Sequence, residues 1–277
     1  MSSLRSVLRL IRRRRVRVRL KPAFMDPLRL LLCGGKVVAS PAASDFQSLL
    51  VDLDRSFGTS QMLLRESRNA ATPKDRAILP YASRSLLEIS TNLLIARLDP
   101  FRVLALRKCQ LGGSYALGVR AGMAMSWMGD VYTKDGARSS WNPDKSATSL
   151  SRALFDNPWA ELAWSPAFER AVDCLEGERG KWMTEMRSFA AENFIPAARG
   201  RILSIYSAMS KGVHHELVIP TESLLDELTL RAECGDLIKW LAYLGFVASF
   251  IDHAATRLSS RSALQLLRAV QLQEGAL

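Results

Sequence analysis

Between residues 45 and 68, apolar side chains recur every three or four positions, the spacing that places them on one face of an α-helix. The members of this stripe are Phe46, Leu49, Leu50, Leu53 and Phe57. Ser44 and Asp45 precede the stripe, and both residue types favour the N-terminal cap of a helix. The pattern therefore predicts an amphipathic helix that lays one face on a hydrophobic core.

A second helix is predicted to begin at Thr72-Pro73, because threonine caps a first turn and proline there loses no hydrogen bond. Pro80 lies further along and is expected to kink or restart this helix. The main segment then runs from Tyr81 to Arg97 and is apolar nearly all round. A helix of this kind belongs in the middle of a bundle.

The remaining body follows the same helical pattern, with no run of alternating strands separated by turns. Further helices are predicted at 101–111, 114–131, 147–155, 158–163, 166–175, 182–191 and 197–217, from 221 or 223 through 251, and at 262–273. Residues 27–43 are expected to be extended, residues 132–145 to form a loop, and residues 177–180 to break the chain. We predict an all-α helical bundle, a single domain over residues 26–277, with an inserted or peripheral helical region near 130–195.

The stretch Ser204–Leu217 is the densest in chemistry, because it holds two of the three histidines beside a serine, a lysine and a glutamate. On one continuous helix, Lys211 would lie three residues from His214 and one turn from His215. A histidine moves protons near neutral pH, and a neighbouring cation stabilises negative charge. We therefore predict a polar site at His214 and Lys211.

Arg84 and Glu88 lie one turn apart on the central helix and complete the predicted site if that helix faces the histidines. Glu88 would orient an imidazole, and the planar guanidinium of Arg84 suits two phosphate oxygens. The alternative is that Arg84 and Glu88 pair with each other, or with Lys211 and His214, as a satisfied polar layer. Gly212 favours the site, because a glycine inside a helix needs a reason in packing or function.

The net charge of +11 comes largely from the first 21 residues, which carry nine basic residues and no acidic ones. Without these nine, the remaining 29 basic residues face 27 acidic ones, a net charge of +2. Residues 1–25 are interpreted as a disordered basic arm, or as the result of a start codon placed too early, since Met25 would open the body well. The alternatives are an amphipathic membrane-surface or transit segment and a nucleic-acid arm that contacts phosphates. The predicted phosphate contacts of such an arm are Arg12, Arg13, Arg14, Arg15, Arg17 and Arg19.

The four cysteines stand singly, at positions 33, 109, 174 and 234, without the paired spacing of a zinc site or a disulfide framework. We predict reduced, buried thiols in a cytoplasmic protein, with no metal and no cofactor. The longest apolar run, Leu237–Ile251, is short for a membrane span and contains Lys239, so no integral membrane segment is expected.

Two of these segments carry a family resemblance. R-S-L-L-E at 84–88 and Y-S-x-x-S-K-G-V-H at 206–214 resemble uncharacterised bacterial helical proteins related to the HEPN superfamily, which occur in toxin–antitoxin and phage-defence loci. The resemblance covers about residues 75–255 and implies a HEPN-like bundle that cleaves RNA without a metal, usually as a dimer. The chain departs from the family's Arg-x4–6-His pair. The positions expected to hold that arginine are Ser207, Ala208, Met209, Ser210, Phe246, Val247 and Ala248.

The resemblance and the clustered residues together predict a protein that binds or cleaves RNA, as a ribonuclease toxin or a defence effector. In this interpretation His214 is the acid or base, Lys211 and Arg84 contact phosphate, and Glu88 orients the imidazole. His253 is expected to be structural, on the last long helix. The alternative is a non-catalytic helical adaptor that binds a partner protein from the same operon or a second copy of itself.

Overall fold

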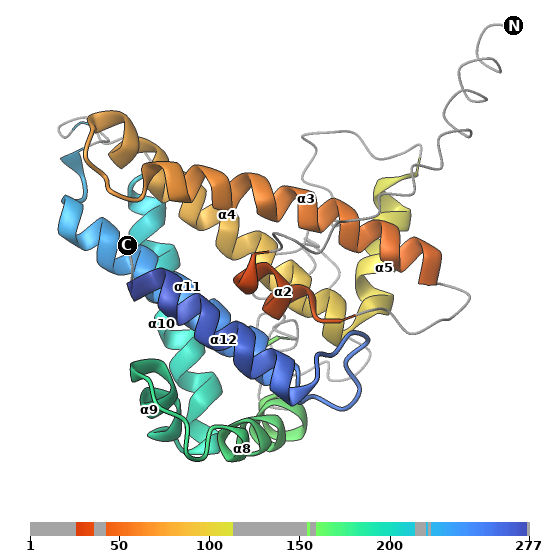
Figure 1. The fold of residues 1–277 in the computed structure, drawn as a ribbon. Helices are drawn as coiled ribbons and strands as arrows, with labels where there is room; N and C mark the ends of the chain where they lie inside the picture. Colours follow the sequence, from red (N-terminus) through yellow and green to blue (C-terminus); the bar gives the residue numbers. More distant parts are fainter. Residues whose placement is uncertain are drawn as a thin grey trace, which may run out of the picture.

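The computed structural model describes residues 26–35, 43–112, 154–155, 159–213, 220 and 223–275. Every regular element within these ranges is helical, so the all-α class is confirmed (Figure 1). The helices are α2 (Pro27–Cys33), α3 (Ala43–Ser67), α4 (Pro73–Leu98), α5 (Pro100–Gln110), the π-helix η2 (Ala160–Trp164), α8 (Ser165–Cys174), α9 (Lys181–Arg187), α10 (Ala191–Lys211), α11 (Glu227–Ala248) and α12 (Ser260–Gly275). The predicted elements at 114–131, 132–145 and most of 147–155 fall outside the described residues.

The two helices predicted over 45–68 and 72–97 are present as α3 and α4, and they lie side by side as a long hairpin (Figure 1). The buried stripe of α3 includes Phe46 and Phe57. Thr72 caps α4 through a capping box with Asp75, in which each residue's side chain accepts a hydrogen bond from the other's backbone N–H. Such a cap contributes about 1 kcal/mol to the free energy of unfolding.

Helix α4 continues through Pro80, so the expected restart at this proline is wrong. Pro80 lies in the second turn of the helix, where it removes one backbone hydrogen bond. Its ring is buried against Gly212 at the end of α10. We infer that this packing offsets the lost hydrogen bond.

The expectation of an extended segment at 27–43 is wrong for its first part, which forms α2. The Asp26 carboxylate accepts hydrogen bonds from the backbone N–H groups of Leu28 and Arg29 at 3.0 and 3.2 Å, and Pro27 occupies the first helical position. This is the same signal as Thr72-Pro73, and it outweighs the glycines that follow it. Gly34 ends the helix with a φ of 74°, a conformation that favours glycine.

Helix α11 is the most deeply buried element, and Leu237–Ala248 is buried almost without interruption, as predicted. It packs against α2, α4 and α12. Helix α10 also packs against α4 and crosses it (Figure 1). The helix begins at Glu227 after an Asp226 cap, later than the expected start at 221–223. It ends at Ala248, so the placement of His253 on this helix is also wrong.

Helices α8 and α9 lie at one end of the bundle and share its core (Figure 1). The Phe168 ring of α8 stacks on Phe194 of α10 at 4.5 Å, and the Trp182 ring of α9 meets Tyr243 of α11 edge-on at 5.9 Å. Helix α9 is shorter than the predicted 182–191, and α10 begins at Ala191 rather than at 197. The two short helices predicted near 158–175 form one run, η2 followed by α8.

Candidate functional site

The two segments of the predicted site, far apart in the sequence, meet where α10 crosses α4. The Arg84 guanidinium carbon lies 4.8 Å from the ring centroid of Tyr206, within reach of a cation–π contact. A turn away, a Cβ on Gly212 would lie 2.5 Å from the Pro80 Cγ, so only glycine permits this approach. Pro80, Arg84, Tyr206 and Gly212 are called the α4–α10 contact below.

Arg84 and Glu88 form an ion pair within α4, with the Arg84 Nε 3.2 Å from the Glu88 Oε1. Their side chains are 30% and 44% exposed. The pairing that the sequence offered as an alternative therefore exists, but the pair lies at the surface rather than in a buried layer. At such exposure its contribution to stability is about 0.3–0.5 kcal/mol after solvent screening.

Helix α10 ends at Lys211, and Gly212 and Val213 form a turn. The continuous helix predicted over 197–217 is therefore wrong at residues 212 and 213, and the shared face predicted for Lys211, His214 and His215 involves two residues outside the described part. The cause is the packing of Gly212 on Pro80, which fixes the end of the helix there. Lys211 is exposed, while His214 and His215 lie outside the described residues.

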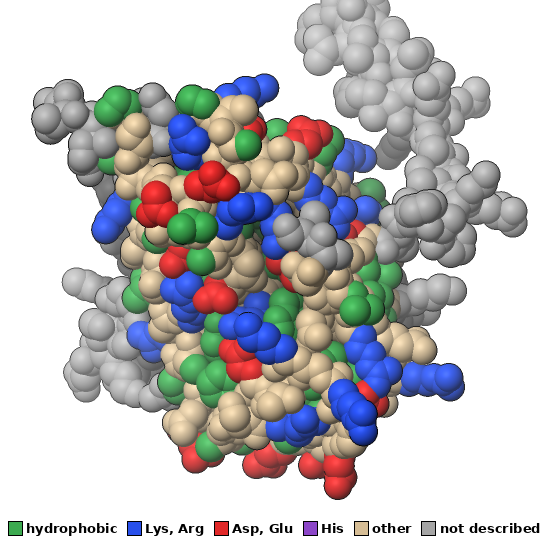
Figure 2. All heavy atoms as spheres, turned by 60° about the vertical axis from the view of Figure 1, so that its left-hand side comes forward, with side chains coloured by type: hydrophobic (Ala, Val, Ile, Leu, Met, Phe, Trp, Pro, Cys, Tyr) green, Lys and Arg blue, Asp and Glu red, His purple; other side chains and the backbone are tan. Residues whose placement is uncertain are grey.

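The predicted arm, with Arg12 to Arg15, Arg17 and Arg19, also lies outside the described residues. On the face of the body in Figure 2, Lys and Arg side chains alternate with Asp and Glu, without a large area of one sign. This agrees with the net charge of +2 that remains when the nine N-terminal basic residues are removed. An electrostatic attraction to nucleic acid therefore depends on the arm far more than on this face.

Arg97, near the end of α4, is fully buried and was not predicted to be special. Its Nη1 donates to the Leu31 carbonyl oxygen at 2.6 Å and to the Gly245 carbonyl oxygen at 3.4 Å. Its Nε donates to the Thr256 carbonyl oxygen at 3.0 Å, and its Nη2 to the Ser249 hydroxyl at 3.4 Å. We call these five residues the Arg97 cluster.

The Arg97 cluster joins α2, α4, α11 and the segment after α11 through one side chain, and Arg97 forms no ion pair with any described residue. Burial lowers the pKa of Arg97 to about 10, which still leaves it charged at neutral pH. Backbone carbonyls supply the negative ends of dipoles that replace its hydration. Every residue has a backbone carbonyl, so a sequence does not indicate which carbonyls a buried arginine will contact. For Arg97, the sequence therefore predicts only a position near the end of a helix.

A polar pocket of about 360 Å³ lies between α9, α11 and α12. The Arg68 and Glu274 side chains, which are 13% and 12% exposed, form a two-bond ion pair at its edge, with Nη1 2.6 Å from Oε1. Lys239 pairs with Glu185 at 2.9 Å and with Asp236 at 3.3 Å. Tyr243 donates to Glu185 behind the pocket, and burial raises the pKa of this phenol well above its usual range.

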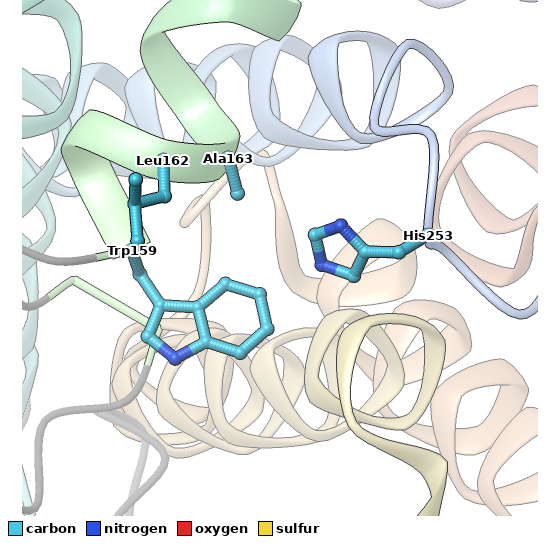
Figure 3. Close-up of a pocket in the computed structure, with 4 residues that line it drawn as sticks. All are labelled: Trp159, Leu162, Ala163 and His253. Atoms are coloured by element: carbon cyan, nitrogen blue, oxygen red, sulfur yellow. The ribbon is translucent and has the colours of Figure 1, made fainter.

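An apolar pocket of about 310 Å³ is lined by Trp159, Leu162, Ala163 and His253. Figure 3 shows the Trp159 and His253 rings on opposite sides of the gap, with Ala163 above it, and their centroids lie 5.4 Å apart. Leu162 is 81% exposed, and its backbone belongs to the π-helix η2, an irregularity that is frequent at functional sites. His253 is exposed and lies in a turn after α11.

No group of three His, Cys, Asp or Glu side chains that would hold a metal ion occurs among the described residues. Within the same residues, no helix is both long and apolar enough to cross a membrane. No protein-family model, curated protein or solved structure matches this chain.

Proposed function

We propose that this chain is an RNA-directed helical protein of HEPN-like type, in which Arg84, Glu88, Lys211 and His214 act on a phosphodiester. The observation that carries the proposal is the α4–α10 contact. It brings R-S-L-L-E and Y-S-x-x-S-K-G side by side although more than a hundred residues separate them. Arg84, Glu88 and Lys211 are all open to solvent, as residues that meet a large substrate must be.

Each residue has a distinct role in this proposal. Arg84 and Lys211 contact the phosphate, and their charges stabilise the additional negative charge of the transition state. His214 accepts the proton of the 2′-hydroxyl as its oxygen attacks phosphorus. The bond from phosphorus to the 5′-oxygen then breaks, the 5′-oxygen takes a proton from the imidazolium, and a 2′,3′-cyclic phosphate remains.

In this proposal Glu88 orients the Arg84 guanidinium, with which it pairs, in place of the imidazole that the sequence analysis assigned to it. A guanidinium that is stacked on an aromatic ring and held by a carboxylate has few rotamers left. A preorganised cation loses less conformational entropy on binding than a free one. Because the pair is partly exposed, it separates at a small free-energy cost when phosphate arrives.

The test compares wild type with His214→Ala in cells that express the protein, with growth and the integrity of total RNA as readouts. His253→Ala is the matched control, because it removes the exposed histidine of the apolar pocket. We expect wild type and His253→Ala to degrade RNA and His214→Ala to leave it intact. Equal behaviour of all three, with intact RNA, would overturn ribonuclease action by this chain alone.

A chain beginning at Met25 separates RNA delivery from chemistry. Removal of nine basic residues lowers the electrostatic part of the affinity for RNA. It also makes that affinity depend less steeply on the salt concentration. We expect the shortened chain to retain cleavage at low ionic strength and to lose it at physiological salt. Unchanged cleavage at both ionic strengths would show that the arm does not deliver the substrate.

A second function, that of a non-catalytic interaction subunit, is favoured by the apolar pocket. An exposed leucine, Leu162, lies beside an apolar hollow, so two copies related by a two-fold axis can each insert this side chain into the other. A charged group would lose its hydration in this lining without compensation. The body's net charge of +2 also gives little repulsion between two copies. The occupant that we propose is a second copy of this chain.

Sedimentation velocity tests this second function with Leu162→Glu, and Leu228→Glu serves as its control. Leu228 is also exposed on a helix, at 76%, but lies far along the chain on α11. Self-association of wild type and Leu228→Glu, with a monomeric Leu162→Glu, would support it. A wild type that is monomeric at all concentrations would exclude the second copy as the occupant.

A further inference from the structure

The polar pocket between α9, α11 and α12 contains more hydrogen-bond donors than free acceptors. Both of its carboxylates are already engaged, because Glu274 accepts from Arg68 and Asp236 accepts from Arg201 and Lys239. The Arg201 Nε lies 2.9 Å from the Asp236 Oδ2, and the Lys239 Nζ lies 3.3 Å from the other oxygen, Oδ1. The carboxylate acceptors of the pocket are therefore already occupied by hydrogen bonds within the protein.

The donors are less fully used. Lys181 lines the pocket, is exposed, and forms no ion pair with any described residue. The Gln271 side chain accepts a hydrogen bond from the Trp182 backbone N–H at 3.0 Å through its oxygen, which leaves the amide N–H groups to donate. Lys239 has three N–H donors and two carboxylate partners.

The wall of the pocket also leaves room for a ligand. Gly235 and Gly275 both line it, so neither α11 nor α12 places a side chain at these positions. A Cβ on Gly235 would meet no neighbour closer than the Glu274 Oε2 at 4.0 Å, so the glycine is not required by internal packing. Glycine in a helix interior costs about 1 kcal/mol relative to alanine, a cost that packing does not explain here.

We propose that this polar pocket is a binding site for a small molecule that carries an oxyanion, a phosphate or carboxylate group. Lys181 and the Gln271 amide donate to the anion, and Lys239 adds its remaining N–H. The Gly235 surface admits the body of the ligand. This inference is independent of the proposed action on RNA, because the pocket shares no residue with the α4–α10 contact.

The experiment titrates the full-length chain with sodium phosphate and, in parallel, with sodium acetate, against sodium chloride at equal ionic strength. The signals followed are the Gln271 side-chain amide and the Trp182 indole in a nitrogen-resolved NMR spectrum. We expect saturable shifts with phosphate, with acetate or with both, and none with chloride. The phosphate and acetate arms tell which group the site prefers. Shifts with neither anion would overturn the proposal.

Two variants make the test specific. Lys181→Gln removes an exposed charge, and we expect the protein to fold normally and bind the anion about tenfold more weakly. Gly235→Ala should raise the melting temperature by about 2–4 °C, since alanine favours helix, and yet weaken binding by narrowing the pocket. Gly200→Ala is the matched control: Gly200 lies in α10 with no neighbour near its Cβ position, so the same stabilisation should leave binding unchanged. Wild-type affinity in both Lys181→Gln and Gly235→Ala would exclude the pocket.

Discussion

Two of the three arginines of helix α4, Arg84 and Arg97, lie thirteen residues apart, and the fold uses them in opposite ways. Arg84 is 30% exposed, pairs with a carboxylate one turn away and stacks on Tyr206. Arg97 is fully buried and bonds to the backbone of α2, α11 and the segment after α11. A charged side chain near a surface is therefore available for a ligand, whereas a charge surrounded by backbone carbonyls has become part of the architecture.

The largest effect is expected from Arg97→Met, which keeps an unbranched apolar stem and removes the guanidinium with all its donors. The carbonyl oxygens of Leu31 and Thr256 would then be buried without their partner. We expect the free energy of unfolding to fall by about 3–5 kcal/mol, as when one partner of a buried charged interaction is lost. Urea unfolding followed by circular dichroism measures this difference.

Arg97→Lys refines the same test. A lysine keeps the positive charge but has a single nitrogen, so it cannot reach carbonyls in several directions at once. We expect it to recover only a minority of the lost free energy. A loss below about 1 kcal/mol in either variant would show that the cluster does not hold these segments together.

Gly245→Ala tests the packing beside Arg97 without touching a charge. A Cβ at this position would lie 3.0 Å from the Leu31 carbonyl carbon and oxygen, so α2 must move away from α11. We expect a loss of about 1–3 kcal/mol, the usual effect of adding a methyl group to a packed interior. Gly200→Ala is the control on α10, where alanine should raise the free energy of unfolding by up to about 1 kcal/mol. Equal stabilisation by both substitutions would contradict the close approach of α2.

Two thiols, the half-buried Cys33 and the buried Cys234, should make the fold sensitive to alkaline pH. Burial raises the pKa of Cys33 from 9.0 to about 12, with Asp54 adding to the shift, and burial raises that of Cys234 to about 11. Both folded pKa values exceed those of the unfolded chain, so their contribution to stability is complete below pH 9 and is lost between pH 9 and 11 or 12. Each thiol contributes a slope of about 1.4 kcal/mol per pH unit within its window.

Urea unfolding at several pH values from 8 to 11 checks this slope in wild type and in the double variant Cys33→Ala, Cys234→Ala. The double variant should show a shallower decline, because lysine and tyrosine titration is common to both proteins. Parallel pH profiles would mean that the thiols ionise as readily in the folded chain as in the unfolded one.

Sequence patterns were sufficient for elements whose determinants are local. The capping box of Thr72 with Asp75, the stripe of α3 and the apolar run of α11 all follow from residues within one helix. The sequence placed Arg84 in the site only on the condition that its helix faces the 204–217 segment, and the structure brings Arg84 to Tyr206 of that segment.

The errors arose where a distant segment decides the outcome. Gly212 was predicted to lie inside a helix. In the structure Pro80, more than a hundred residues earlier, packs against Gly212, and α10 ends just before this glycine. Arg97 was predicted only as the last residue of the central helix, but its partners are backbone carbonyls from three other segments. Asp26-Pro27 was the exception: it is a local signal of the same kind as Thr72-Pro73 and it does start a helix, but our prediction gave more weight to the glycines that follow it.

The smallest expected effect on stability is that of Arg84→Gln, and it bears most directly on function. An exposed ion pair one turn apart contributes about 0.3–0.5 kcal/mol, so the loss should lie within that range plus a small cation–π term. If Arg84 contacts phosphate, the same substitution should reduce RNA cleavage at least about tenfold, because a charged hydrogen bond to the reacting group is lost. Glu88→Gln is the matched variant, since it breaks the same pair and leaves the guanidinium in place. Cleavage that survives both substitutions would place Arg84 with Arg97, as a residue that serves the fold alone.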